Sequence, residues 1–122
     1  MRIRPERVGN LMQREIADIL ANDLRDPRLS AMVSVTDVEV TGDLSFARVF
    51  VSVLADENGT ARALEGLSRA AGFIRRMLAP RLGLREVPEL RFLIDPSIQQ
   101  GARVDDLLRR IEKGEKLEDE ES

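Results

Sequence analysis

The sequence contains no cysteine and no histidine. Disulfides and thiolate chemistry are therefore excluded, as are the commonest general base and the zinc sites built from Cys and His. Carboxylate chemistry remains open, but no pair of acids suggests a catalytic centre. We expect a protein that is not an enzyme and that uses no metal and no cofactor.

Aromatic side chains are also scarce, with four Phe and no Tyr or Trp among 122 residues. Proteins that read single-stranded RNA usually stack bases on exposed aromatic rings. We expect Phe73 and Phe92 in the core, which leaves Phe46 and Phe50 for an open sheet face. RNA binding would then rest on phosphate contacts and shape, and would depend strongly on salt.

Long apolar runs are absent, so no segment is expected to span a bilayer. The charged start of the chain does not resemble a signal peptide. The length allows one domain, which we place at residues 1–112, followed by a disordered acidic tail at 113–122. We expect a cytoplasmic protein.

The net charge of −3 hides an uneven distribution. Residues 112–122 hold six acids and two lysines, a net −4, so residues 1–111 carry +1. Seventeen of the nineteen basic residues are arginine. Phosphate recognition explains this bias, and a GC-rich genome explains it equally well.

Basic charge is concentrated between residues 69 and 91, where six arginines meet only two acids. They surround a small-residue break, Ala70-Ala71-Gly72, at which another backbone can approach closely. Guanidinium groups match phosphate geometry, so this segment suggests a surface that grips a nucleic-acid backbone. The arginines are Arg69, Arg75, Arg76, Arg81, Arg85 and Arg91.

Each candidate contact has a simpler structural interpretation. Arg75 and Arg76 would contact phosphates at the start of the helix after the break, or would form its solvated face. Arg81 and Arg85 would extend the same surface. The break at Ala70-Ala71-Gly72 would be a kink needed for packing, a place where an RNA backbone approaches closely, or both.

The first helix offers further candidates. Arg4 and Arg7 would reach RNA from a flexible terminus or would be solvated. Arg14 has Glu15 beside it, which favours a solvated face.

Apolar spacing predicts a helix over 5–22, followed by a loop at Asp26-Pro27. Two Val-rich strands over 33–40 and 45–54 are joined by a turn at Thr41-Gly42-Asp43. In the second strand we expect one face, Ala47, Val49, Val51 and Val53, to be the core face.

A helical stretch follows, with Thr60 as its expected N-cap. Its apolar register passes through the break without slipping, which indicates either two helices or one kinked helix. Pro80 is expected to end or bend the second part, and Gly83 to close it. A third strand over 89–94 and a last helix capped by Asp95 complete the order.

This order is the type II KH arrangement, an α+β fold (α-β-β-α-kink-α-β) with a three-stranded mixed sheet, helices on one face and a C-terminal helix. An Ala-x-Gly stands where such domains carry a GxxG clamp. The segments around it are Arg7-Val8, Ile16, Asp26-Pro27-Arg28-Leu29, Val35-Thr36-Asp37-Val38, Asp43-Leu44-Ser45, Ala71-Gly72-Phe73-Ile74-Arg75, Leu84-Arg85, Val87-Pro88-Glu89-Leu90-Arg91-Phe92, Asp95 and Ser97. With the Ala-x-Gly and these segments at these spacings, the sequence resembles the bacterial ribosome-binding factor A family.

The resemblance implies a ribosome biogenesis factor without catalytic activity. Such a factor binds free small (30S) subunits or their precursors, assists late maturation and processing of 16S rRNA, and supports growth in the cold. The resemblance also implies a functional link to a ribosome-associated GTPase. We expect a monomer whose partner is the small subunit and its rRNA.

Three other functions remain open from the residues alone. A generic type II KH module would bind other RNA, although the missing GxxG and scarce aromatics disfavour it. A protein adaptor would use the open sheet face and would bind independently of salt. A small enzyme would need paired acids with shifted pKa values.

Overall fold

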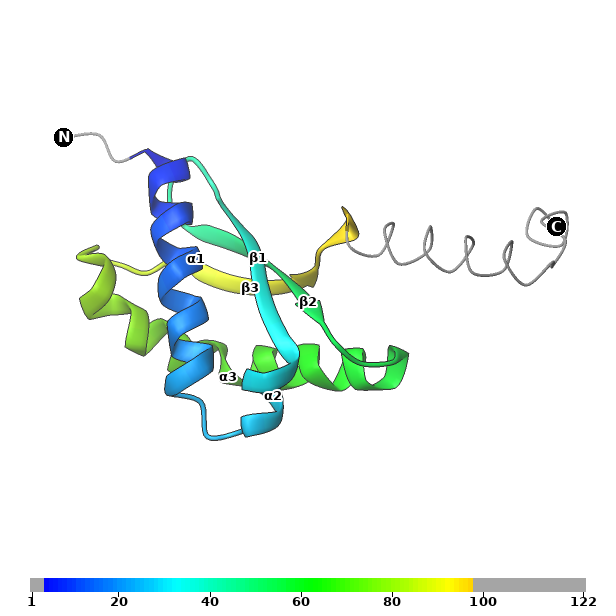
Figure 1. The fold of residues 1–122 in the computed structure, drawn as a ribbon. Coiled ribbons are helices and arrows are strands. Elements are labelled where there is room, and N and C mark those ends of the chain that lie inside the picture. Colours follow the sequence, from blue (N-terminus) through cyan, green and yellow to red (C-terminus); the bar gives the residue numbers. More distant parts are fainter. Residues whose placement is uncertain (1–3, 98–122) are drawn as a thin grey trace, which may run out of the picture.

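The computed structural model describes residues 4–97, which form three helices and a three-stranded sheet (Figure 1). The helices are α1 (Pro5–Asn22), α2 (Pro27–Met32) and α3 (Glu57–Leu82). The strands are β1 (Val33–Val40), β2 (Phe46–Val53) and β3 (Glu89–Ile94). The expected acidic tail and most of the expected last helix lie outside the described residues.

The sheet has the order β1-β2-β3, with β1 antiparallel to β2 and β2 parallel to β3. The mixed, KH-like arrangement expected from the sequence is confirmed. It arises because the hairpin joins neighbouring strands, while α3 carries the chain across to a parallel partner.

The core lies between one face of the sheet and the helices. Ala47, Val49 and Val51 of β2 are completely buried, as expected from their alternation. From the helices come Met12 and Ile16 of α1 and, among others, Leu67, Ile74 and Leu78 of α3, all equally buried. The opposite face of β2 carries Phe46 and Phe50, which are half-buried. Helices therefore cover one face and leave the other open.

A β-bulge keeps β1 in register with the core. Its pairing with β2 shifts between Val35 and Asp37, so Thr36 has no pairing partner. The extra residue lets Val33 and Val38 both be buried, although strict alternation would turn one of them outward. The Thr36 side chain, whose Oγ1 lies 2.7 Å from Asp95 Oδ2, links this bulge to the end of β3.

Helix α1 packs on β1 unusually closely at Gly9. A Cβ on this residue would lie 2.6 Å from the carbonyl oxygen of Val38. Nearby, Gln13 Nε2 donates to the Thr36 carbonyl oxygen at 3.1 Å, and Asp37 Oδ1 accepts from the Val38 N–H at 2.9 Å. These contacts occupy polar backbone groups along an edge strand, which reduces its capacity to pair with another chain.

The sequence leaves open whether residues around the small-residue break form two helices or one kinked helix, and the structure shows one. α3 is a single element of 26 residues that continues through Ala70-Ala71-Gly72. Figure 1 shows its last turns inclined to its first turns. The helix does not end at Pro80 but extends past it to Leu82. Gly83 then closes the helix in the left-handed conformation, with φ of 65°, as the sequence predicts.

Two local predictions were wrong. The N-cap of α3 is Asp56, not Thr60, because the Asp56 carboxylate accepts the Gly59 N–H at 2.7 Å and starts the helix earlier. The segment after Asp26 is not the expected loop, because Pro27–Met32 forms α2. Proline suits the first helical turn, and six residues are too few for a periodic signal.

Candidate nucleic-acid interface

Among the arginines of residues 69–91, some have a partner within the described part of the protein and others do not. Arg69 forms an ion pair with Glu65 one turn earlier on α3. Both side chains are mostly exposed, so the pair contributes little to stability. Arg91 lies over the Phe46 ring, with its Cζ 5.3 Å from the ring centre, and makes a cation–π contact on the open sheet face.

Arg75 connects α3 to the loop before β3. Its Nη2 donates to the Val87 carbonyl oxygen at 2.8 Å, and its Nε is buried without a hydrogen-bond partner. A guanidinium held in this way positions backbone and has less freedom to meet a ligand. The sequence predicts a phosphate contact here; in the structure the side chain reaches into the protein.

Arg81 binds three carboxylates at once. Its Nη1 donates to Glu15 at 3.0 Å and to Asp18 at 2.7 Å, and its Nη2 donates to Asp23 at 3.0 Å. The arginine side chain is 25% exposed. We call this group the Arg81 clamp. It fastens the end of α3 to the second half of α1 and to the residue that follows α1.

The clamp alters the acidity of its members. The hydrogen bond from Arg81 lowers the pKa of Asp18, and the bonds to Asp18 and then to Glu15 raise the pKa of Arg81. Both shifts favour the charged forms. The Arg81 guanidinium therefore stays paired with these carboxylates across the physiological pH range.

Four predicted site residues are exposed and carry no ion pair among residues 4–97: Arg4, Arg7, Arg76 and Arg85. Arg76 lies one turn after Gly72 on α3. At Gly72 an added Cβ would meet only the Arg76 guanidinium, at 4.0 Å. The small-residue break is therefore open at Gly72, whereas Ala70 and Ala71 are partly buried against the core.

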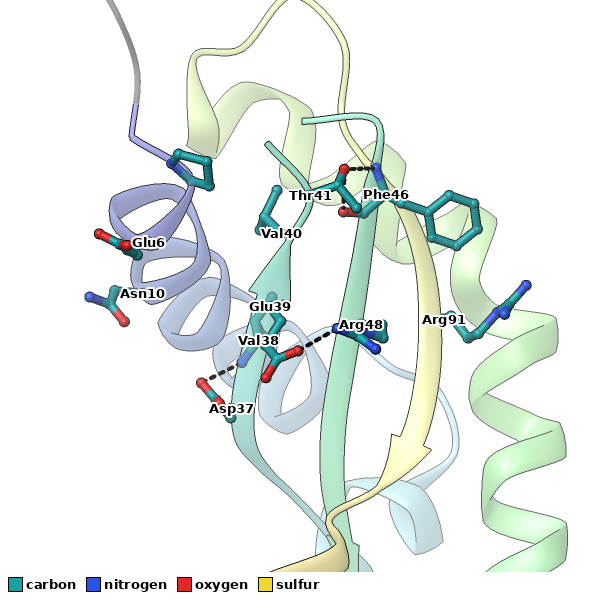
Figure 2. A pocket seen from close by; sticks show the side chains of 11 residues that line it. Glu6, Asn10, Asp37, Val38, Glu39, Val40, Thr41, Phe46, Arg48 and Arg91 are labelled. Atoms are coloured by element: carbon teal, nitrogen blue, oxygen red, sulfur yellow. Dashed lines mark hydrogen bonds and ion pairs between the residues drawn. The ribbon is translucent and has the colours of Figure 1, made fainter. Parts of the chain in front are cut away.

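A hollow of about 570 Å³ lies beside β1, where Figure 2 shows the side chains of α1 and of the strands around it. Its charges are mixed. Glu6 and Asp37 line it, and Glu39 forms an ion pair with Arg48 at 2.7 Å. Arg91 is at its far side, on Phe46. Three acids against two arginines make this lining less favourable to phosphate than a wholly basic one.

Other kinds of site find no support in residues 4–97. No group of three or more metal-ligating side chains occurs among them. No helix in the same stretch is long and apolar enough to cross a membrane.

Sequence reasoning missed one arrangement. Arg14, interpreted as a solvated side chain, lines a groove of about 720 Å³ together with Arg7 of the same helix. The opposite wall is the end of α3, at Leu82, Gly83 and Leu84. The spacing of Arg7 and Arg14 is visible in the sequence, but the opposite wall depends on tertiary packing.

Comparisons with known proteins agree with this architecture. The family model described as Ribosome-binding factor A matches residues 4–108. The ribosome-binding factor A of Acetivibrio thermocellus is 50% identical over 105 residues, which cover 86% of this chain and 85% of that protein.

Solved structures of relatives share the fold. The crystal structure of ribosome-binding factor A from Thermus thermophilus has a TM-score of 0.65 at 32% identity, covering 74% of this chain and 93% of that one. A homology model of the Thermus thermophilus ribosome-binding factor A, fitted into the cryo-EM map of its complex with the 30S subunit, has a TM-score of 0.58 at 34% identity, covering 70% of this chain and 88% of that one. With these matches over most of its length, the chain belongs to the ribosome-binding factor A family.

Proposed function

We propose that this protein binds free small ribosomal subunits or their precursors and assists late maturation of 16S rRNA. The observation that carries the proposal is the family match over residues 4–108. It is supported by a relative of 34% identity, a homology model of which was fitted into the cryo-EM map of its 30S complex. The proposal extends to rRNA processing, growth in the cold, release linked to a ribosome-associated GTPase, and action as a cytoplasmic monomer.

The RNA contacts proposed here are the exposed arginines, Arg4, Arg7, Arg76 and Arg85. Their charges are available to phosphates because no carboxylate among the described residues neutralises them. Gly72 would allow an RNA backbone to approach α3 beside Arg76. Arg75 and Arg81 would act through the fold, since each is held by intramolecular hydrogen bonds. Arg69, whose pair with Glu65 is exposed, would still be able to reach RNA.

Recognition of this kind depends on the shape of a folded rRNA site. The described residues present no Tyr or Trp, and Phe46 has one ring face occupied by Arg91. Stacking on bases is therefore a small part of the interface, and phosphate contacts carry the affinity. Binding should consequently fall steeply with salt.

Co-sedimentation tests the proposal. The protein is mixed with free small subunits, large subunits or intact ribosomes, at low and at moderate salt. We expect retention on free small subunits only, and release as salt rises. Retention on every particle, or on none, would contradict the proposal, and salt-independent retention would favour a protein adaptor.

A matched pair of variants tests the contact at Arg76. Arg76→Glu is expected to weaken binding to small subunits by about tenfold or more, since a charge-assisted contact becomes a repulsion. Arg62→Glu makes the same change at another exposed position of α3 and is expected to bind nearly as well as the unaltered protein. Arg75 is kept intact because its replacement would disturb the loop at Val87.

A further inference from the structure

A groove runs between α1 and the end of α3, and all its lining side chains are basic or neutral. We call it the basic groove and define it by Arg7, Leu11, Arg14, Leu82, Gly83 and Leu84. Asn10 and Gln13 are its other polar side chains. In contrast to the hollow beside β1, no carboxylate lines it.

Two features of the chain build the wall opposite α1. The Arg81 clamp holds the last turn of α3 against α1 through Glu15 and Asp18. Gly83 then turns the backbone with a φ of 65°, so that Leu82 and Leu84, on either side of it, both pack against the core. The groove is therefore a fixed part of the fold.

The wall formed by α1 carries a stripe of positive charge. Arg7, Leu11 and Arg14 recur at spacings of four and three, so they share one helix face. Both arginines are exposed, and their Cα atoms lie about 10.5 Å apart along the helix axis. Neither forms an ion pair within residues 4–97.

The acids that follow on the same helix are bonded to Arg81 and do not line the groove. Glu15 and Asp18 lie next along α1, and both accept hydrogen bonds from Arg81. The Arg81 clamp thus has a second consequence besides joining the helices. It holds these two carboxylates at Arg81, so that no acid lines the groove beside Arg7 and Arg14.

We propose that the basic groove binds a short stretch of RNA sugar–phosphate backbone, with Arg7 and Arg14 on phosphates and Leu11 against the sugars. This inference rests on the proposed function and names a contact site for it. Leu11 is partly buried and is not among the residues packed on the core, so the exposed part of its side chain can meet a ligand in the groove.

An RNA backbone fits the basic groove better than a protein helix does. A helix bound in a groove needs a broad apolar floor for anchors at several turns. Here Leu82 and Leu84 pack part of their side chains against the core. Among the leucines of the groove, this leaves Leu11 as the one apolar anchor that a bound helix could use. Two exposed guanidinium groups without acidic neighbours in the lining favour phosphates instead.

The test compares two double variants with equal changes in charge. Arg7→Glu/Arg14→Glu alters the basic groove, and Arg25→Glu/Arg62→Glu alters two exposed arginines outside it. Binding to salt-washed free small subunits is measured over a range of salt concentrations. Circular dichroism and thermal unfolding confirm that each variant is folded.

We expect the groove variant to bind at least about tenfold more weakly. Its plot of log affinity against log salt should become shallower by roughly 0.7–0.9 for each phosphate that the variant no longer binds. The control variant should retain most of the affinity and the original slope. Leu11→Gln, which preserves helix propensity, should weaken binding without changing the slope.

Other results would overturn the inference. Equal decreases in the two double variants would mean that general charge, and not the groove, drives binding. Weaker binding of the groove variant with an unchanged salt slope would mean that the groove meets a protein of the subunit. If the unaltered protein does not bind small subunits at all, the proposed function itself fails; if it binds and both variants match it, only the groove assignment fails.

Discussion

Two glycines of this chain lie in helices but have opposite surroundings. Gly9 of α1 faces the Val38 carbonyl oxygen, which lies 2.6 Å from where a Cβ would stand. Gly72 of α3 is exposed, and nothing lies closer than 4.0 Å to the same position. The absence of a side chain is therefore a packing requirement at Gly9, whereas at Gly72 the fold does not require it.

Alanine at these two positions should change stability in opposite directions. Gly9→Ala is expected to destabilise the protein by about 1–3 kcal/mol, because α1 must move away from β1. Gly72→Ala is expected to stabilise it by about 1 kcal/mol through helix propensity. Urea unfolding measures both. If Gly72→Ala destabilises the fold instead, Gly72 has a structural role that its surroundings do not explain.

The hairpin turn contains a carboxylate with a strongly shifted acidity. The hydroxyl of Ser45, then that of Thr41, and the Ser45 N–H donate hydrogen bonds to Asp43, and together they lower its pKa from 3.8 to about 2. A pKa lowered by folding means that the charged form stabilises the native state. Asp43 thus supports a turn in which Leu44 has a φ of 61°, uncommon for a side chain of its size.

The contribution of Asp43 should depend on pH in a defined direction. It is fully present above pH 3.8 and is lost as pH falls from about 3.8 to about 2, where the folded-state carboxyl takes up its proton. Asp43→Ala is therefore expected to be less stable than the unaltered protein at pH 6, with the difference shrinking below pH 3.8. A difference that stays constant down to pH 2 would contradict this account.

At the scale of elements, one side chain joins the end of α3 to α1 by ion pairs, in addition to the shared core. The Arg81 clamp brings Glu15, Asp18 and Asp23 together. Without the guanidinium, these acids would repel one another near the end of α1. Arg81 directly precedes Leu82, Gly83 and Leu84, which line the basic groove.

Removing the guanidinium should loosen this attachment. Arg81→Gln is expected to lower the midpoint of thermal unfolding, whereas Arg76→Gln, at an exposed position without an ion pair, should leave it nearly unchanged. The difference should shrink at high salt and below pH 3.8, where Asp18 gains a proton as pH falls through its lowered pKa. Equal midpoints for the two variants at neutral pH and low salt would argue against the Arg81 clamp.

At the scale of the whole molecule, charge is divided along the chain. Residues 1–111 carry +1, and the remaining residues carry −4. We propose that the acidic tail discourages binding to unrelated RNA by competing with phosphates for the arginines. The tail lies outside the residues that the structure describes, so the proposal rests on composition.

Shortening the chain tests this proposal. A protein that ends at residue 112, without the tail, should bind an unrelated single-stranded RNA more tightly than the full chain at low salt. A full-length variant with its five tail acids changed to Gln or Asn should behave like the shortened protein, because length is kept and negative charge is removed. If either variant binds the unrelated RNA with the same affinity as the full chain, the proposed role of the tail is contradicted.

The sequence by itself determined the order of the elements, the mixed sheet and the core face of β2. These follow from local periodicity and from a turn and a crossover that allow few topologies. It also pointed to the family, through segments spread over the chain. It could not predict the bulge at Thr36, the short helix at 27–32 or the cap at Asp56, because each depends on a few hydrogen bonds or on packing.

Tertiary structure decided which arginines remain free. Arg75 and Arg81 look the same as Arg76 and Arg85 in the sequence, since all four stand in one basic segment. Packing brings Arg75 to the Val87 carbonyl and Arg81 to acids more than fifty residues away. It also joins Arg14 to the far end of α3. A guanidinium is available to a ligand only if no partner lies within its reach, and that depends on distances which only the fold defines.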